Sequence, residues 1–563
     1  MHKLSIEDYI VFLVYFIIVA GYGSWIYLRK KSAQASSKDY FLAEGSLTWW
    51  AIGTSLIASN ISAEQFIGMS GNGFKMGLAI STYEWMAALT LIIVAVFFIP
   101  VYLKNKIYTM PQFLHQRYNG TVAMIMAVFW LLLYVMVNLT SILYLGALAV
   151  SSLSGLNLTL CMYGLAIFSI IIALGGMKVI GYTDVIQVFF LILGGLITTY
   201  LALNKVAELN GQTGVLNGWH YMVSQSKADH FHMILNRDNP NYPSLPGLTV
   251  LIGGMWIVNL NYWGCNQYIT QRALGADLKT ARSGILFAAF LKLLMPVIVV
   301  LPGIAAYVLY HSGHQLTAEG EMVIGGKLTA DRAYPVLLQL LPAGLKGLSF
   351  AALTAAIVAS LAGKVNSIAT IFTLDVYKKK IDVNASETKL VKTGKIVLVV
   401  SMLIGVVIAP HLGIDKGGFD YIQEYTGFVS PGIFAMFILG FFWKKASSGA
   451  ALFATIGGFI FSVILKILPR FMDLHFLSGM GFSTPVTQDN GSILYEIPFL
   501  DRMGFVFVIC IVAMYIISMI GYKKGKLTKG LEIDAKMFKV NPAFAVGSLI
   551  IIGILAALYT IFW

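Results

Sequence analysis

The amino-acid sequence predicts an all-α polytopic membrane protein with about 14 transmembrane helices. Of its 563 residues, 58% are hydrophobic and only 12% are charged, and the mean hydropathy is +0.78. Soluble domains carry about twice this charged fraction. The net charge of +13 comes from basic residues that cluster in short loops between apolar runs. This distribution is typical of membrane topology and argues against nucleic-acid binding.

The predicted spans follow one another along the whole chain. The first one, from Ile6, is too long for the apolar core of a cleaved signal peptide. The spans are expected at 6–28, 47–72, 77–102, 122–150, 157–176, 180–203, 246–270, 281–310, 346–376, 391–411, 419–443, 448–468, 502–522 and 543–563. The basic loop from Arg29 to Lys38 is predicted to be cytoplasmic, so both termini are expected on the outer face of the cell membrane.

Two of these spans carry polar and glycine residues where a lipid-facing helix would carry Leu and Val. The second span contains Ala58-Ser-Asn-Ile-Ser-Ala-Glu-Gln65, and the seventh combines Gly253-Gly254 with Asn259. Non-helical backbone at membrane depth is tolerated only inside protein or beside a wet cavity. Because the two segments are five spans apart, their units run in opposite senses across the membrane. This pattern indicates an inverted-repeat transporter.

The repeat predicts five parts of the chain. They are an additional helix with a cytoplasmic loop (1–46), repeat one (47–203), an extracellular loop (204–245), repeat two (246–443) and three additional helices (444–563). The cysteines lie inside apolar segments without metal or redox spacing, and His230 and His232 have no third ligand nearby in the sequence. We therefore expect no metal site at these cysteines and histidines.

Polar side chains inside spans cost roughly 2.5–3.5 kcal/mol at the bilayer centre, so each is a candidate functional residue. The ionisable ones are Glu84, Asp184, Lys292 and Lys364. A sugar pocket needs a carboxylate, an ammonium, amides and an aromatic face. These needs are met by Glu84, Lys292, Gln65, Asn259, Gln423 and Tyr262. The alternative is a set of structural hydrogen bonds between helices with one Glu–Lys pair.

A cation could bind between the first broken span and the helix predicted at 346–376. Ala356, Ala359 and Ser360 lie on one face of that helix. Ala58 and Ile61 could offer backbone carbonyls, because an interrupted helix leaves such groups without partners. Hard cations prefer oxygen ligands of this kind.

Motifs across residues 50–445 resemble those of the solute–sodium symporter family, in its bacterial sodium/galactose and sodium/glucose branch. The motifs are Ser62-Ala-Glu-Gln-Phe-Ile-Gly-Met69, Tyr83-Glu-Trp-Met86, Gly175-Gly…Thr183-Asp-Val-Ile-Gln-Val188, Asn259…Tyr262-Trp-Gly, Ser367…Thr370-Ile-Phe-Thr-Leu-Asp375 and Gln423-Glu-Tyr-Thr-Gly427. The resemblance implies a LeuT-type core of five-plus-five inverted repeats. It also implies sodium-coupled symport of a hexose by alternating access, with no enzymatic activity.

The resemblance also assigns roles to individual residues. The implied sugar contacts are Gln65, Glu84, Asn259, Lys292 and Gln423, with Tyr262 as an inner gate that stacks on the sugar ring. The implied outer gate is Met69, Tyr83 and Phe419. The implied sodium ligands are Ala58, Ile61, Ala356 and Ser360 together with position 359, and Asp184 lies on the inward exit route. Na⁺, a sugar and the lipid bilayer are the expected partners, and no obligate protein partner is expected.

The sequence departs from the family in both sites. Ala87 replaces a serine and Asn261 replaces an aromatic residue. The sequence therefore does not predict which hexose is bound. Ala359 lacks the second sodium hydroxyl, and Lys364 follows Ser360 by one turn. Lys364 lies about 16 Å from the inner helix end, too deep to reach the interface easily, so we expect an internal partner, Asp184. Lys364 could therefore replace the bound cation, and the alternative function is sodium-independent or proton-coupled hexose transport.

Other functional classes fit less well. A membrane sensor or enzyme would need a soluble domain or a catalytic cluster, which the sequence does not indicate. A channel would need an oligomeric pore motif, and the internal repeat argues against one.

Overall fold

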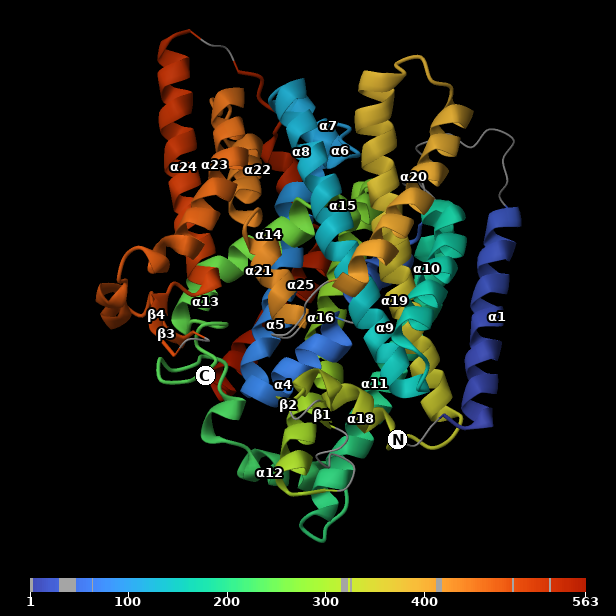
Figure 1. Cartoon of the computed structure of the whole chain (residues 1–563). Helices are drawn as coiled ribbons and strands as arrows, with labels where there is room; N and C mark the ends of the chain where they lie inside the picture. Colours follow the sequence, from blue (N-terminus) through green and yellow to red (C-terminus); the bar gives the residue numbers. More distant parts are fainter. Residues whose placement is uncertain are drawn as a thin grey trace. The chain divides into compact units, whose positions relative to one another are not determined.

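The computed structural model describes residues 4–29, 47–62, 64–314, 322–324, 327–411, 418–488, 491–525 and 528–563. These residues are helical almost throughout, which confirms the predicted all-α class (Figure 1). Within the described ranges, ten helices are long and apolar enough to cross a membrane, and two shorter apolar helices lie at Leu158–Leu174 and Ser430–Phe442. Together with the two interrupted segments, they correspond to the predicted spans. The basic loop at 30–38 lies outside the described residues.

The chain forms two compact units. Unit 1 comprises Met1–Glu84, Trp130–His232 and Gln271–Ile422, and unit 2 comprises Trp85–Phe129, Met233–Thr270 and Gln423–Trp563. Each unit takes segments from both predicted repeats, so the units do not follow the repeat boundaries, which stay a prediction. We describe each unit by itself.

Unit 1 is organised around α19 (Leu345–Thr370), which continues as the π-helix η8 (Ile371–Ile381) and is almost fully buried. Its sequence is rich in Ala, Ser and Gly, and small residues let neighbouring helices approach closely inside a membrane. The helices that pack against α19 are α1 (Ile6–Arg29), α3 (Trp49–Asn60), α9 (Thr140–Ser154), α10 (Leu158–Leu174), α11 (Gly176–Glu208) and α20 (Glu387–Ile408).

Unit 1 contains further helices and two short strands. They are η1 (Glu64–Met69), α4 (Ser70–Met76), η2 (Gly77–Ser81), the start of α5 (Thr82–Ile93), η4 (Tyr134–Leu139), α12 (Val215–Gln225), η5 (Ala228–Phe231), the end of α15 (Gln267–Leu274), α16 (Leu278–His311), β1 (Val323–Ile324), β2 (Lys327–Leu328), η7 (Ala330–Arg332), α18 (Ala333–Leu338), η9 (Ala409–His411) and the start of α21 (Gly418–Gly427). Strands β1 and β2 pair antiparallel.

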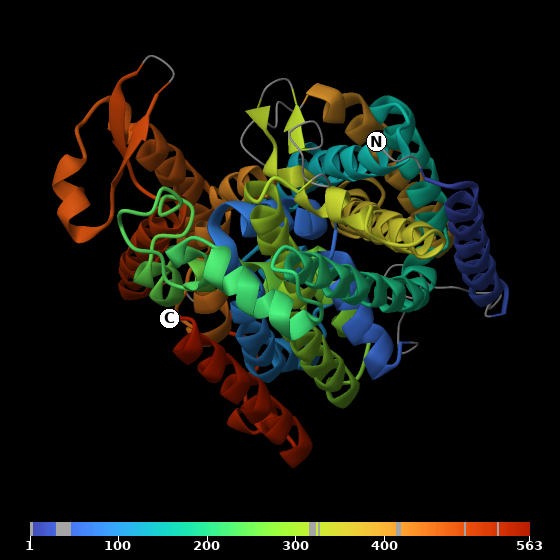
Figure 2. The same cartoon turned by 90° about the horizontal axis from the view of Figure 1, so that it is seen from below.

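Unit 2 has α22 (Ser430–Phe442), α23 (Ser448–Ile467) and α24 (Phe499–Lys523) packed together. A Cβ on Gly432 would lie 2.1 Å from the Ala454 carbonyl oxygen, so only glycine permits this contact between α22 and α23. The remaining elements are η3 (Val94–Phe98), α6 (Ile99–Lys104), α7 (Met110–Arg117), α8 (Gly120–Leu133), α13 (Leu248–Ile252), α14 (Gly254–Gly264), η10 (Leu468–Arg470), η11 (His475–Met480), β3 (Thr484–Thr487), β4 (Ile493–Glu496), η12 (Ala535–Phe538) and α25 (Pro542–Ile561). Strands β3 and β4, drawn in orange in Figure 2, pair antiparallel.

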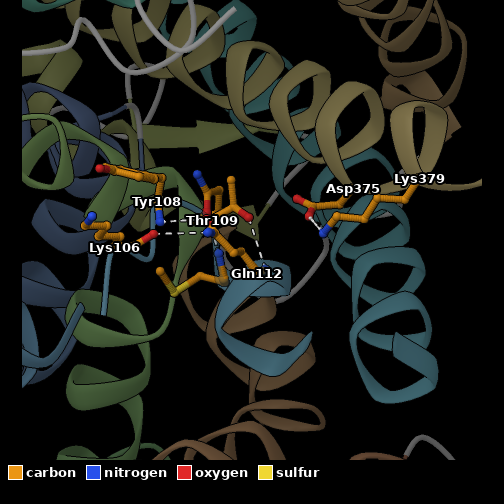
Figure 3. A network of polar contacts seen from close by, with 8 residues as sticks. Lys106, Tyr108, Thr109, Gln112, Asp375 and Lys379 are labelled. Carbon is orange, nitrogen blue, oxygen red and sulfur yellow. Dashed lines mark hydrogen bonds and ion pairs between the residues drawn. The ribbon is translucent and has the colours of Figure 1, made fainter. Parts of the chain in front are cut away.

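Side-chain hydrogen bonds in unit 2 fix the turn that precedes α7 and cap the N-terminus of this helix. The Thr109 hydroxyl accepts a hydrogen bond from the Gln112 amide nitrogen at 3.1 Å, and the Gln112 side chain donates to the Lys106 carbonyl at 3.0 Å (Figure 3). Such bonds satisfy backbone groups that a helix N-terminus leaves without partners.

The second predicted helix interruption lies between α13 and α14. Gly253 separates the two helices with φ −132° and ψ −112°, a backbone conformation far from helical. The structure therefore breaks this segment at the Gly253-Gly254 pair on which the prediction rested.

Candidate functional site: a broken helix between a cation face and a buried ion pair

The first predicted interruption follows Asn60, the last residue of α3. Ile61 adopts an extended conformation, and its amide donates to the Ile57 carbonyl at 2.7 Å. The Gln65 side-chain oxygen then accepts from both the amide and the hydroxyl of Ser62, at 3.2 and 3.3 Å. Since the last carbonyls of a helix have no partner within it, the end of α3 presents oxygens to neighbouring groups.

The predicted cation face of α19 meets these oxygens. The buried Ser360 hydroxyl donates to the carbonyls of Ala58 at 3.4 Å and Ser59 at 3.2 Å. Ile61, Ala356 and Ala359 are also buried on these two segments, and Ala359 contributes only a methyl group. A set of carbonyl and hydroxyl oxygens suits a hard monovalent cation. Sequence reasoning missed Ser59, because a backbone contact leaves no side-chain signal.

A buried ion pair lies beside the same helix end. The Lys292 ammonium on α16 contacts the Glu84 carboxylate on α5 at 2.5 Å, with side chains that are 1% and 3% exposed. The ammonium also donates to the Asn60 side-chain oxygen at the last residue of α3. Two charges at this depth are tolerable because each has a close partner. Asn60 is a further residue of this site that sequence reasoning missed, although its position directly before the helix break was a usable signal.

The predicted outer-gate residues of unit 1 come together. The rings of Tyr83 and Phe419 are 5.0 Å apart and nearly perpendicular, and Met69 is fully buried. A Cβ on Gly68 would lie 2.8 Å from the Phe419 side chain, so glycine allows η1 and α21 to approach closely. The Asn72 amide donates to the Asp420 carboxylate at 3.0 Å in the same region.

Asp184 and Lys364 have different described neighbours. One carboxylate oxygen of Asp184 accepts from the Ser55 hydroxyl at 2.5 Å, and the Arg272 guanidinium donates to that hydroxyl at 2.9 Å. The Lys364 ammonium lies 4.8 Å from the ring centroid of Tyr134 on η4. The pairing of Lys364 with Asp184 therefore stays a prediction.

Three of the predicted sugar residues belong to unit 2. Asn259 is buried on α14 and donates to the Met255 carbonyl of its own helix at 3.1 Å. Tyr262 on α14 packs edge-on against Trp263, and Gln423 lies on α21. The structure also explains Asn261, whose amide donates to the Ser430 hydroxyl at 3.1 Å and links α14 to α22.

Known proteins resemble this chain over most or all of its length. A model of the sodium:solute symporter family matches residues 40–458. The sodium/glucose cotransporter of Vibrio parahaemolyticus is 46% identical, over 100% of this chain and 99% of its own. The sodium/glucose cotransporter 1 of Ovis aries is 31% identical, over 91% of this chain and 78% of its own. The sodium/myo-inositol cotransporter 2 of Homo sapiens is 32% identical, over 82% of this chain and 70% of its own.

A solved structure supports the fold independently. A Na⁺-coupled sialic acid symporter, in a substrate-bound outward-open state, has a TM-score of 0.75 at 22% identity and covers 94% of this chain and 100% of its own. This likeness shows the shared helical fold, the LeuT-type architecture expected from the sequence. The chain is a multi-pass membrane protein and belongs to the sodium:solute symporter family.

Proposed function

We propose that this protein couples the entry of Na⁺ to the uptake of a hexose by alternating access. The observation that carries the proposal is the end of α3. Its Ala58 carbonyl meets the Ser360 hydroxyl of α19, and two residues later Asn60 contacts Lys292 of the buried ion pair. One broken helix thus touches both the cation face and the ionisable groups suited to sugar hydroxyls. The full-length similarity to a sodium/glucose cotransporter supports the same substrates.

In this proposal Na⁺ binds the carbonyls of Ala58 and Ile61 and the Ser360 hydroxyl. These groups belong to the end of α3, to Ile61 directly after it, and to α19, so a bound cation would hold these two segments together. The hexose would use Gln65, Glu84 and Lys292, which supply an amide, a carboxylate and an ammonium. The assignments of Asn259, Tyr262 and Gln423 to the sugar stay predictions.

Uptake into proteoliposomes tests the proposal. The purified protein is reconstituted, and radiolabelled glucose and galactose are offered with Na⁺, K⁺ or choline outside. We expect concentrative uptake of at least one hexose with Na⁺ only. Ser360→Ala should raise the half-saturating Na⁺ concentration. Thr354→Ala on the same helix is the matched control, because its hydroxyl bonds only the carbonyl of its own helix at Phe350 among the described contacts. The absence of uptake of any hexose would overturn the sugar assignment.

A second candidate function is hexose transport that does not use sodium. It is favoured by Lys364, a buried ammonium one turn after Ser360, and by the methyl group of Ala359. In this function a tethered charge takes the role of the bound cation. Uptake would then be equal in Na⁺ and choline, and Lys364→Met would change it strongly. If wild-type uptake depends steeply on Na⁺ and Lys364→Met leaves it unchanged, the second function is wrong.

We also propose that both termini face the outside of the cell. The distribution of basic loops supports this orientation. Alkaline phosphatase folds only outside the bacterial cytoplasm, where its disulfides form. A fusion after Trp563 should therefore be active, and a fusion in the basic loop after α24 should be inactive.

A further inference from the structure

A cavity of about 400 Å³ lies in unit 2 beside the segment that precedes α25. Its lining consists of Lys104 at the end of α6, Lys444 two residues after α22, and residues 530–534. Sites for small ligands have volumes of about 300–1,000 Å³, so this cavity is large enough for one. It contains none of the candidate sodium or sugar residues described above.

Hydrogen bonds to the backbone hold the segment from Thr528 to Asp534 in place. The Thr528 hydroxyl donates to the Lys444 carbonyl at 2.6 Å. The Asn105 side-chain amide donates to the Glu532 carbonyl at 3.1 Å, and the Asn105 oxygen accepts from the Glu532 amide at 3.0 Å. Because these bonds use backbone groups of Lys444 and Glu532, they do not occupy the charged side chains that line the cavity.

The charges of the lining do not neutralise one another. Within the described parts of the chain, the Lys104 and Lys444 ammoniums form no ion pair, and the Glu532 carboxylate has no hydrogen bond or ion pair. The Asp534 carboxylate is used differently, since it accepts from the Lys536 amide at 2.9 Å and caps η12. The cavity therefore offers two cations and one anion to a ligand that carries charges of both signs.

The cavity adjoins a surface that faces lipid. Phe97 in the span that ends at Lys104 is 42% exposed, and Phe442 at the end of α22 is 44% exposed. The ring of Phe538, from the segment before α25, lies 5.4 Å from the Phe97 ring and 6.4 Å from the Phe442 ring. Apolar rings exposed at the ends of membrane spans contact acyl chains. A ligand in this cavity can thus be charged at one end and apolar at the other.

We propose that this cavity binds the headgroup of phosphatidylethanolamine, a zwitterionic phospholipid. The phosphate accepts from the Lys104 and Lys444 ammoniums, and the ethanolamine ammonium donates to the Glu532 carboxylate. The acyl chains lie along the exposed surface at Phe97 and Phe442. Phosphatidylcholine fits less well because its quaternary ammonium has no hydrogen to donate, and phosphatidylglycerol has no cation for Glu532. The bound lipid would join the segment before α25 to the ends of α6 and α22.

Native mass spectrometry of the full chain in detergent tests the proposal. The protein is titrated with phosphatidylethanolamine, phosphatidylcholine and phosphatidylglycerol that have the same acyl chains, and we expect the first to bind most tightly. Lys444→Ala should weaken the binding of all three lipids about threefold, because each has the phosphate. Glu532→Gln should weaken only phosphatidylethanolamine, because the backbone bonds to Asn105 remain and the other headgroups donate nothing to this carboxylate.

Lys106→Ala is the matched control. Lys106 is exposed and lies two residues from Lys104, but it does not line the cavity, so its removal should leave the binding of every lipid unchanged. Phosphoethanolamine, which is soluble in water, carries the same charged groups without acyl chains. It should bind much more weakly than the lipid, because it cannot use the apolar surface beside the cavity.

Four results would overturn the proposal. One is equal binding of the three lipids by the wild type, and another is an equal loss in the Lys444 and Lys106 variants, which would indicate diffuse charge attraction. The third is an equal loss of all three lipids in Glu532→Gln. The fourth is binding of phosphoethanolamine as tight as that of the lipid, which would identify a soluble ligand. None of these readouts requires transport, so a failure of the hexose assignment would leave the test intact.

Discussion

Removing one member of the Glu84–Lys292 pair should destabilise the protein far more than removing both. The two charged groups are 2.5 Å apart, with side chains that are 3% and 1% exposed. Breaking a buried pair from one side costs about 3–5 kcal/mol, because the other charge stays buried without its counterion. Glu84→Gln should cost about 3 kcal/mol of stability, the low end of this range, because the Asn60 oxygen still accepts from Lys292. Lys292→Met should cost about 5 kcal/mol, the high end, because the Glu84 carboxylate then stays buried without its counterion.

A double-mutant cycle measures this coupling. Thermal denaturation in detergent is followed for both single variants and for Glu84→Gln with Lys292→Met. The double variant should be more stable than either single variant, because neither charge remains. Glu208→Gln is the control. It breaks the exposed pair with Lys205, whose side chains are 49% and 37% accessible, and should cost at most about 1 kcal/mol. If the two single effects simply add in the double variant, the reasoning about a buried pair is refuted.

Uptake by the same variants separates structure from recognition. If the pair binds sugar hydroxyls, the double variant is stable and yet fails to accumulate hexose. If it accumulates hexose as the wild type does, Glu84 and Lys292 only join helices, which is the alternative that the sequence left open.

Three further predictions concern other parts of unit 1. Ala359→Ser adds a hydroxyl to the cation face of α19 and should lower the half-saturating Na⁺ concentration of uptake several-fold; an unchanged value would exclude position 359 from the site. Gly77→Ala should lower the melting temperature clearly, because φ is +73° and a Cβ would lie 2.1 Å from the His230 carbonyl oxygen. Gly21→Ala, with open space around it, should not lower it. Burial holds the pKa of His230 below its ordinary value of 6.5, so the unfolded chain binds a proton that the folded chain resists, and stability falls as the pH drops below about 6.5. His230→Gln should flatten the change in melting temperature between pH 7.5 and 5.5, and an equal slope in both proteins would contradict this assignment.

The helix interruptions were predictable because lipid cannot satisfy exposed backbone groups. A polar segment such as Ser59 to Ser62 inside an apolar span has few permitted structures, so its sequence indicates a break. A Glu84–Lys292 pair was part of the alternative that the sequence left open, since a charge at that depth needs a partner.

The partners of individual polar groups were harder to predict. Lys364 was expected to have an internal partner, and Asp184 was the natural candidate in the sequence. The structure shows the Tyr134 ring next to this ammonium, and the pairing with Asp184 stays a prediction. A ring can attract a cation through its electron-rich face, but aromatic residues are too common in spans for the sequence to single one out. The Ser55 hydroxyl beside Asp184 was missed for the same reason, because hydroxyls in spans usually bond the carbonyls of their own helix.

The division into two units was also beyond the sequence. The internal repeat follows from the order of spans along the chain, whereas the units depend on which helices pack together in space. Small residues along α19 allow several helices to approach it, and these helices come from both predicted repeats. Periodicity reveals that such a face exists, but it does not identify the helices that cover it.

The short helix α3 links three polar contacts over a small distance. Ser55 bonds Asp184, the carbonyls of Ala58 and Ser59 accept from Ser360, and Asn60 accepts from Lys292. From Ser55 to Asn60 the helix rises only about 7.5 Å, so it moves as one rigid piece. A cation that draws the Ala58 carbonyl toward α19 must therefore also shift Asn60 against the Glu84–Lys292 pair. This covalent rigidity gives the proposed coupling of Na⁺ to sugar a physical basis that needs no longer path through the protein.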